Sequence, residues 1–347
     1  MTKNRVVYIA ISVLLSVLLI AFLLSKVKTQ DLASMLKGMY WPALFVYIAV
    51  SLIATWLRAW RYKWLLRPQA IGWRDMFLVT FIRNCFDDLL PARIGSLSYI
   101  LVLNKRFSFP FETAASTFVV AFVFDFLTLS PFVVLAILAV GFGAMGISSS
   151  TLLVFAVIYF LIIFILFWKI VPVSRFLLKV YQIFLSAIKA GQKKKAQLSV
   201  EKLLMTIEHL EEIRSRKIFA PMFVLSLFIR LGKYISLYAL LLALLHSHGF
   251  GLQNLSFWKT ILGITGAEMT SVLPIKGIAD FGTWESAWTL AFMLMNFDRN
   301  LAILSGIGIH LITNLFEYSL GFLSILILAV PYFKKKQEGV RPPNLEV

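Results

Sequence analysis

Apolar and polar positions alternate along this chain on a scale of tens of residues, with long apolar runs separated by short polar connections. Six of these runs are predicted to cross a membrane as helices, because such helices need about 20 mostly apolar residues. They cover residues 6–24, 42–57, 111–140, 151–171, 218–245 and 301–333. The first run follows Lys3 and Arg5 as in a signal peptide, but it lacks a small-residue cleavage site, so we expect a retained helix.

Two pairs of shorter apolar segments are each interrupted by a proline motif. The first pair covers residues 76–90 and 94–103, about 22 Å and 15 Å at helical rise, and neither segment crosses a core of about 30 Å. The second pair covers residues 257–273 and 282–297. Both interruptions have Leu-Pro, a cation and glycine: Leu90-Pro91-Ala92-Arg93-Ile94-Gly95 and Leu273-Pro274-Ile275-Lys276-Gly277. We predict two re-entrant helical hairpins; the alternative is that Pro91 and Pro274 kink ordinary helices.

Basic residues gather in some connections and are missing from others. The basic groups are Arg58 to Arg74, Lys105 with Arg106, Lys169 to Lys217 and Lys334 to Arg341. The connections at residues 141–150 and 245–256 contain no Lys, Arg, Asp or Glu. By the positive-inside rule, we expect both termini in the cytoplasm and the protein in the cytoplasmic membrane of a prokaryote. The formal net charge of +17 therefore reflects topology and does not indicate nucleic-acid binding.

The order helix, hairpin, helix occurs twice, over residues 42–140 and 218–333, with the hairpins entering from opposite faces. Such inverted repeats build transporters in which interrupted helices meet near the bilayer midplane. Between them, residues 172–217 are predicted as a basic amphipathic segment, either attracted to anionic lipid or a solvated cytoplasmic linker. The sequence thus predicts an all-α polytopic membrane protein, with a single transmembrane domain over residues 1–333 and a cytoplasmic tail over residues 334–347.

Composition agrees with this class of protein. The chain is 60% hydrophobic with a mean hydropathy of +0.84, too apolar for a soluble domain. Its single cysteine, Cys85, excludes an internal disulfide or a thiolate cluster. We expect no metal site and no cofactor. His310, alone on an apolar helix, is predicted to be a hydrogen-bonded structural histidine.

Ionisable residues at membrane depth are the candidate binding groups, because a charge there is costly. A half-helix that begins at the midplane also attracts anions through its free N–H groups and positive dipole end. The candidates for substrate binding are Arg93, Lys276, Arg230, Lys233, Arg83, Gly95, Ser96, Gly282 and Thr283. Arg93 and Lys276 occupy matching places in the two repeats, which favours a functional role for both.

Acidic residues accompany these cations. The candidates for charge compensation or proton coupling are Asp87, Asp88, Asp125, Glu268, Asp280 and Glu285. Together with Glu317 they are numerous enough to pair with every nearby base, so ion-paired scaffolding is the alternative for each residue. That alternative is favoured for Asp125, Glu317 and Arg83.

Three motifs carry a resemblance to a known family. They are the first hairpin motif at residues 90–95, Phe124-Asp125-Phe126-Leu127, and Leu273-Pro274 followed by Gly282-Thr283-Trp284-Glu285. Over about residues 5–333 the chain resembles the lysylphosphatidylglycerol synthase transmembrane-region family, the flippase-like integral membrane proteins. Arg93, Asp125, Gly282 and Glu285 match the family pattern. Ser96 replaces its usual glutamate, and Phe124 replaces an arginine that commonly precedes the aspartate.

The resemblance implies a membrane domain that moves a lipid or lipid-linked head group between leaflets, with two re-entrant hairpins lining the cavity. We therefore expect a flippase or scramblase for an anionic phospholipid or a polyprenyl-phosphate-linked lipid, with membrane lipids as partners. In bifunctional relatives a soluble aminoacyl-transfer domain follows, and we expect no lipid aminoacylation from this polypeptide. A homodimer is compatible with the sequence.

Two other functions are compatible with the same residues. A secondary transporter of a small water-soluble anion would use the same inverted repeat. A membrane enzyme would use acid/base pairs such as Asp87 with Asp88, or Glu268 with Glu285. The chain has no Walker A loop, dinucleotide-binding glycine pattern, Gly-x-Ser-x-Gly elbow or His-Glu-x-x-His motif, so we expect that it is not an enzyme. Any uphill transport would draw on a gradient, and passive scrambling fits equally well.

Overall fold

A computed structural model describes residues 29–89, 95, 97–140, 149–187, 194–215, 218–269 and 281–337. Helices and their short connections make up these ranges, and no strand occurs among them, which confirms the all-α prediction. The first half contains α2 (Thr29–Lys37), α3 (Trp41–Leu65), α4 (Trp73–Leu89), α5 (Leu97–Phe107), α6 (Phe111–Leu127), α7 (Leu129–Val140) and α8 (Ser149–Trp168). The second half contains α9 (Ile170–Ala187), α10 (Lys194–Ser215), α11 (Phe219–Leu245), the 3-10 helix η2 (His246–His248), α12 (Phe257–Met269), α13 (Thr283–Leu294) and α14 (Arg299–Gln337).

Most predicted spans are present as helices. Five segments of the described chain are long and apolar enough to cross a membrane: Trp41–Leu65, Phe111–Val140, Ile170–Ala187, Phe219–His248 and Arg299–Ala329. Four coincide with predicted spans, whereas the third is α9, which the sequence predicts to be amphipathic. The span predicted at residues 151–171 forms α8, an apolar helix of 20 residues and about 30 Å. The span predicted at residues 6–24 lies outside the described residues, and the number of six spans stays a prediction.

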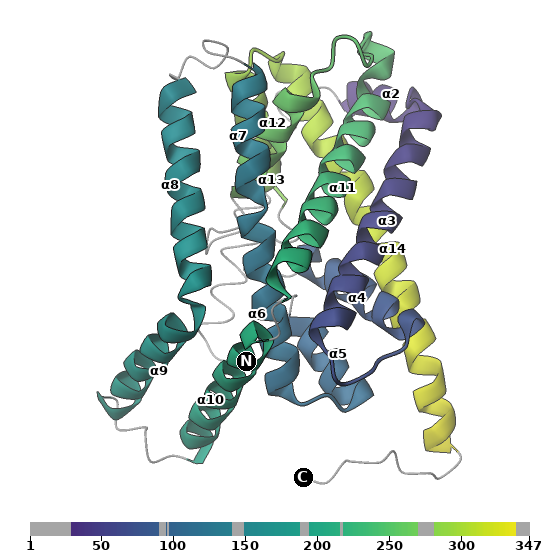
Figure 1. Cartoon of the computed structure of the whole chain (residues 1–347). Coiled ribbons are helices and arrows are strands. Elements are labelled where there is room, and N and C mark those ends of the chain that lie inside the picture. Colours follow the sequence, from purple (N-terminus) through teal and green to yellow (C-terminus); the bar gives the residue numbers. More distant parts are fainter. Residues whose placement is uncertain are drawn as a thin grey trace.

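Two pairs of short helices occupy the places of the predicted hairpins. α4 and α5 have 17 and 11 residues, and α12 and α13 have 13 and 12, so each is shorter than a hydrocarbon core of about 30 Å. The members of each pair pack against each other, as in a helical hairpin and unlike the halves of a kinked helix. Figure 1 shows α4 and α5 at the lower end of the bundle, and α12 and α13 at the upper end. Their entry into a bilayer stays a prediction.

The packing of the helices connects the two predicted repeats. α3 and α11, the first helices of the two repeats, pack along each other. α4 of the first hairpin packs on α14, the last helix of the second repeat, while α12 of the second hairpin packs on α7 at the end of the first repeat. α4 and α14 approach so closely that a Cβ atom on Gly321 would lie 2.3 Å from Cβ of Cys85. Each hairpin therefore completes its packing against the other repeat.

The buried apolar residues form two large clusters, one toward each end of the bundle. The first contains Tyr62, Tyr99 and Ile229 among others, and the second contains Tyr47, Tyr234 and Trp288 among others. The long helices α3 and α11 contribute residues to both clusters. Their charged residues lie between the two clusters. Arg230 and Lys233 separate Ile229 of the first cluster from Tyr234 of the second. A polar layer therefore lies between two apolar cores.

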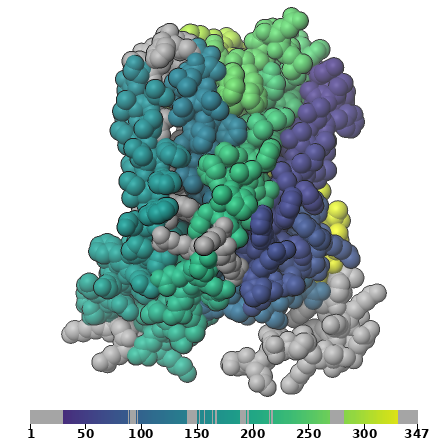
Figure 2. Space-filling model, in the orientation of Figure 1, coloured from purple at the N-terminus to yellow at the C-terminus, as the bar shows by residue number. Residues whose placement is uncertain are grey.

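The outer surface of the bundle also fits a protein surrounded by lipid. Large apolar side chains are exposed on α3, α8 and α14, and exposed apolar surface of this extent marks membrane contact. Figure 2 shows that the α9–α10 pair extends from the lower end of the bundle below α8.

Gly95 lies against the backbone of α4 in the first hairpin. An added Cβ atom would lie 1.5 Å from the carbonyl oxygen of Phe86, which only a backbone shift relieves. We expect Gly95→Ala to destabilise the protein by about 1–3 kcal/mol through overpacking, measured by thermal unfolding in detergent. Gly251→Ala is the control, because no atom lies within 4 Å of the position that its Cβ would take. An unchanged midpoint for Gly95→Ala would contradict the close packing of the hairpin.

Candidate functional site

Two adjoining cavities lie in the polar layer. The larger has a volume of about 190 Å³ and is lined by residues of α3, α4, α11, α13 and α14. The smaller has a volume of about 80 Å³ and is lined from α3, α4, α6, α7, α11 and α12. Arg58, Arg83, Asp87 and Lys233 line both cavities. Both hairpins therefore contribute to the walls of one polar region.

Ion pairs connect the helices around the smaller cavity. On the side of the second hairpin, Arg230 Nη1 lies 2.8 Å from Glu268 Oε2, and Lys233 Nζ lies 2.5 Å from Glu268 Oε1. These contacts join α11 to α12. Arg230 Nη2 also donates a hydrogen bond to the carbonyl oxygen of Asp125 on α6. The carboxylate of Glu268 is thus paired with both Arg230 and Lys233.

The first repeat contributes two further pairs. Arg61 Nη1 on α3 lies 2.7 Å from Asp125 Oδ1 on α6 and also donates to Ser226 Oγ on α11 at 3.0 Å. The side chain of Arg61 is fully buried. Within α4, Arg83 Nη2 lies 3.1 Å from Asp87 Oδ2. The contacts of Arg61 connect α3 with α6 and α11, whereas the Arg83–Asp87 pair lies within α4.

Arg58 is placed differently from the other cations. Its Nη1 donates to Asn84 Oδ1 at 3.0 Å, and Arg83 Nη1 donates to the same oxygen at 3.2 Å. Arg58 makes no ion pair with a described carboxylate, and its buried Nε has no hydrogen-bond partner in the described chain. Because the amide oxygen of Asn84 is neutral, it orients the two guanidinium groups side by side without adding a counter-charge, so Arg83 keeps its partner Asp87 while Arg58 has no described carboxylate partner. Two adjacent cations of limited solvation favour an anion between them.

The described side chains around the smaller cavity carry more positive than negative charge. The cations are Arg58, Arg61, Arg83, Arg230 and Lys233, and the carboxylates are Asp87, Asp125 and Glu268. Glu317 adds a carboxylate to the wall of the larger cavity. The arrangement can therefore accept a guest of negative charge without burying an uncompensated anion.

A second polar cluster anchors the start of α13. His310 Nδ1 on α14 lies 2.5 Å from Glu285 Oε1, and both side chains are buried. The other oxygen of Glu285 accepts a hydrogen bond from the Gly282 backbone N–H at 2.7 Å. The ring of His310 packs on Phe281 and Trp284, with centroid distances of 4.5 Å and 5.2 Å. His310 is hydrogen-bonded as predicted, and with Trp284 it forms part of the wall of the larger cavity.

The structure brings together many of the residues that the sequence singled out. Six of them line the smaller cavity: Arg83, Asp87, Asp125, Arg230, Lys233 and Glu268. Gly282 and Thr283 lie at the beginning of α13, directly before Trp284 of the cavity wall. Gly95 is buried against the backbone of α4, and its role in substrate binding stays a prediction. Arg93, Ser96, Lys276 and Asp280 lie outside the described residues, as does the side chain of Asp88, so their roles stay predictions.

Sequence reasoning missed Arg58, Arg61 and Asn84. The two arginines belong to a basic group that the positive-inside rule attributes to topology, and the structure places both inside the bundle instead. One signal was available. Arg58 and Arg61 on the first helix of one repeat have the same spacing as Arg230 and Lys233 on the first helix of the other.

The Arg61–Asp125 pair gives a prediction about stability. Asp125→Asn leaves a fully buried guanidinium without its counter-charge, and removing one partner of a buried pair costs about 3–5 kcal/mol. We expect a marked drop in the thermal unfolding midpoint of the protein in detergent. Glu208→Gln removes one negative charge from the exposed face of α10 and should leave the midpoint unchanged. Equal midpoints for the two variants would show that the pair contributes little.

Comparison with known proteins places the chain in a family. The lysylphosphatidylglycerol synthase TM region family matches residues 9–321 of the 347, a stretch that contains both hairpins and every residue lining the two cavities. No curated protein matches the chain. The chain therefore belongs to the lysylphosphatidylglycerol synthase transmembrane-region family, a family of membrane proteins with a function connected to lipids.

Proposed function

We propose that this protein translocates a phosphate-bearing anionic lipid between the leaflets of a membrane, as a flippase or scramblase. The observation that carries the proposal is the pair of guanidinium groups of Arg58 and Arg83, held by the neutral amide of Asn84 at the boundary of two cavities. Guanidinium groups bind phosphate oxygens through two parallel hydrogen bonds, which gives geometric selectivity as well as affinity. Membership of a lipid-related membrane family supports the lipid as the bearer of the phosphate.

In this mechanism the headgroup crosses the bilayer inside the bundle while the acyl chains stay in the lipid. A cavity of about 190 Å³ accommodates a headgroup and not two acyl chains. The phosphate binds first where Arg58 lacks a carboxylate partner, and Arg230 and Lys233 offer the next cations along α11. Asp87, Asp125 and Glu268 neutralise the cations when no guest is present, which limits the cost of the empty state.

The two short helix pairs line the path of the lipid headgroup through the bundle. We propose that α4–α5 and α12–α13 dip into the bilayer from opposite faces, because irregular backbone at this depth is tolerated where it lines a polar cavity. The basic connections then face the cytoplasm of a prokaryotic cell, together with both termini. The protein acts on its lipid without a chemical step, so it is a transporter and not an enzyme.

The Asn84→Asp variant tests whether the guanidinium groups of Arg58 and Arg83 bind the substrate or only stabilise the fold. The substitution keeps the size of the side chain and places a carboxylate between two guanidinium groups, where it neutralises them in place of a phosphate. We expect intact thermal stability but at least about a tenfold slower translocation of labelled phosphatidylglycerol in proteoliposomes, because hydrogen bonds to charged groups are worth about 1.5–3 kcal/mol. Asn300→Asp adds the same charge at the exposed start of α14 and is the matched control. If Asn84→Asp is as active as the wild type, the guanidinium pair is only a scaffold.

The same vesicles distinguish the lipid from a small water-soluble anion as substrate. We expect wild-type protein to move phosphatidylglycerol and to leave a glycolipid without phosphate in its leaflet, while entrapped inorganic phosphate stays inside. Release of phosphate without movement of any labelled lipid would replace the proposal by transport of a soluble anion.

The hairpin topology predicts a pattern of accessibility. Cysteines placed at Gln69 and Ser108, on either side of α4–α5, should react with an impermeant maleimide from one face of the membrane. Cysteines at Gln253 and Asn300, on either side of α12–α13, should react from the other face. The native Cys85 is buried and contributes little background. Labelling of Gln69→Cys and Ser108→Cys from opposite faces would mean that α4–α5 crosses the bilayer.

A further inference from the structure

α9 and α10 form a helical pair outside the central bundle. α9 follows α8 after the single residue Lys169, and α8 alone has the length of about 30 Å that a bilayer core requires. Figure 1 shows α9 turning away from the axis of α8 at the lower end of the molecule, next to α10. α10 carries many charged residues along its length, including Glu201, Lys202 and Glu208. The pair therefore begins where the hydrocarbon core ends.

The side chains of α9 divide its surface into three stripes. Val171, Leu178 and Leu185 recur every seven residues and are buried. A second stripe is apolar but exposed, at 46–67% of each side chain: Phe176, Leu177, Val180, Ile183 and Phe184. At 100° per residue, a third stripe with Arg175 and Lys179 lies between the other two. Cations at the border of an exposed apolar stripe are the arrangement of a helix that lies in a membrane surface.

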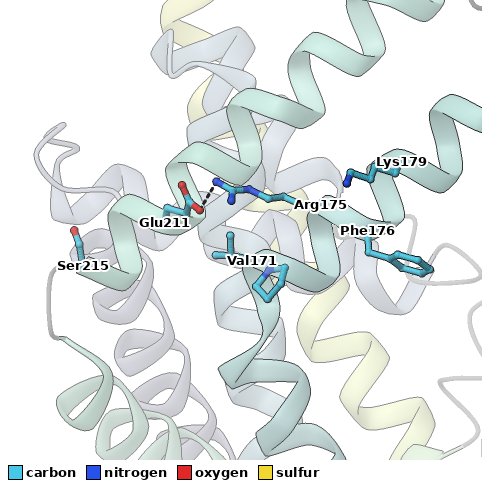
Figure 3. Close-up of a pocket in the computed structure, with 7 residues that line it drawn as sticks. Val171, Arg175, Phe176, Lys179, Glu211 and Ser215 are labelled. Carbon is cyan, nitrogen blue, oxygen red and sulfur yellow. Dashed lines mark hydrogen bonds and ion pairs between the residues drawn. The ribbon is translucent and has the colours of Figure 1, made fainter.

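A groove follows the cationic stripe, between α9 and α10. Its volume is about 740 Å³, and Arg175, Phe176, Lys179, Glu211 and Ser215 are among the residues that line it. Figure 3 shows Arg175 reaching across toward α10, with Lys179 on the same side of α9 and Phe176 directed away from Glu211. Arg175 Nη2 lies 2.6 Å from Glu211 Oε1, and the two side chains are 60% and 41% exposed. A pair this exposed is weak, so an anion of higher charge density can displace Glu211.

We propose that this groove binds the phosphate headgroup of an anionic phospholipid from the adjacent leaflet. Arg175 and Lys179, one helical turn apart, bind the phosphate oxygens, since charge-assisted contacts of this kind are strong and Arg matches phosphate geometry. The acyl chains lie along the exposed apolar stripe that begins at Phe176. The cationic stripe thus meets the headgroup of the lipid, and the apolar stripe beside it meets the acyl chains.

The site is separate from the central cavities. No residue that lines the groove lines either cavity, and α9 and α10 contribute to neither wall. The proposal therefore does not rest on lipid translocation. Lipid bound in this groove holds the α9–α10 pair against the membrane surface, beside α6, on which α10 packs.

The test measures retained lipid by native mass spectrometry. The full chain is reconstituted in nanodiscs of phosphatidylcholine containing phosphatidylglycerol, and is then released into detergent. We expect Arg175→Ala with Lys179→Ala to lower the occupancy of one retained phosphatidylglycerol per protein about tenfold, with any molecule held by the central cavities and the retention of phosphatidylcholine unchanged. The control, Lys37→Ala with Lys259→Ala, removes the same charge from α2 and α12 and should retain lipid as the wild type does.

Glu211→Gln provides an independent test that keeps both cations. It removes the competitor for Arg175, so we expect more retained phosphatidylglycerol than in the wild type. Unchanged or lower retention in this variant would overturn the proposal, as would equal loss of both lipids in the double variant. Displacement of the lipid by millimolar inorganic phosphate would identify a site for a soluble anion and would also overturn it.

Discussion

The constraint on which this structure depends is that charge buried at membrane depth needs a compensating partner. Five cations meet around one small cavity, and they and their counter-charges come from α3, α4, α6, α11 and α12. Arg61 with Asp125, and Arg230 with Glu268, tie α3 to α6 and α11 to α12. Arg83 is paired with Asp87, but Arg58 meets only the neutral carbonyl oxygen of Asn84 and no described carboxylate. We base the proposal of anion binding on this neutral contact of Arg58.

The sequence predicts the positions of the helices well, because a membrane imposes length and composition on each span. The apolar runs locate α3, α6–α7, α11 and α14, and the interruptions at Pro91 and Pro274 locate the two short pairs. The amphipathic pattern over residues 172–217 anticipates the exposed stripe of α9. These features are local, so the chain encodes them in neighbouring residues.

The composition of the site is harder to predict, because it depends on the rotation of each helix about its axis. Trp60 is exposed while Arg61, the next residue of α3, is fully buried, and nothing in the basic group from Arg58 to Arg74 distinguishes an inward cation from one at the surface. Asn84 gains its role from Arg58, 26 positions earlier in the chain, together with its neighbour Arg83. Arg93 and Lys276 lie outside the described residues, so their matched placement stays a prediction.

The contact between α4 and α14 has a consequence for how the protein is made. Cys85 faces Gly321 across a gap that admits no side chain, so α4 packs against α14, which follows it much later in the chain. Translation proceeds from the N-terminus, and α4 leaves the ribosome long before α14 exists. The first hairpin can therefore complete its packing only after α14 has been synthesised, and the two repeats mature together.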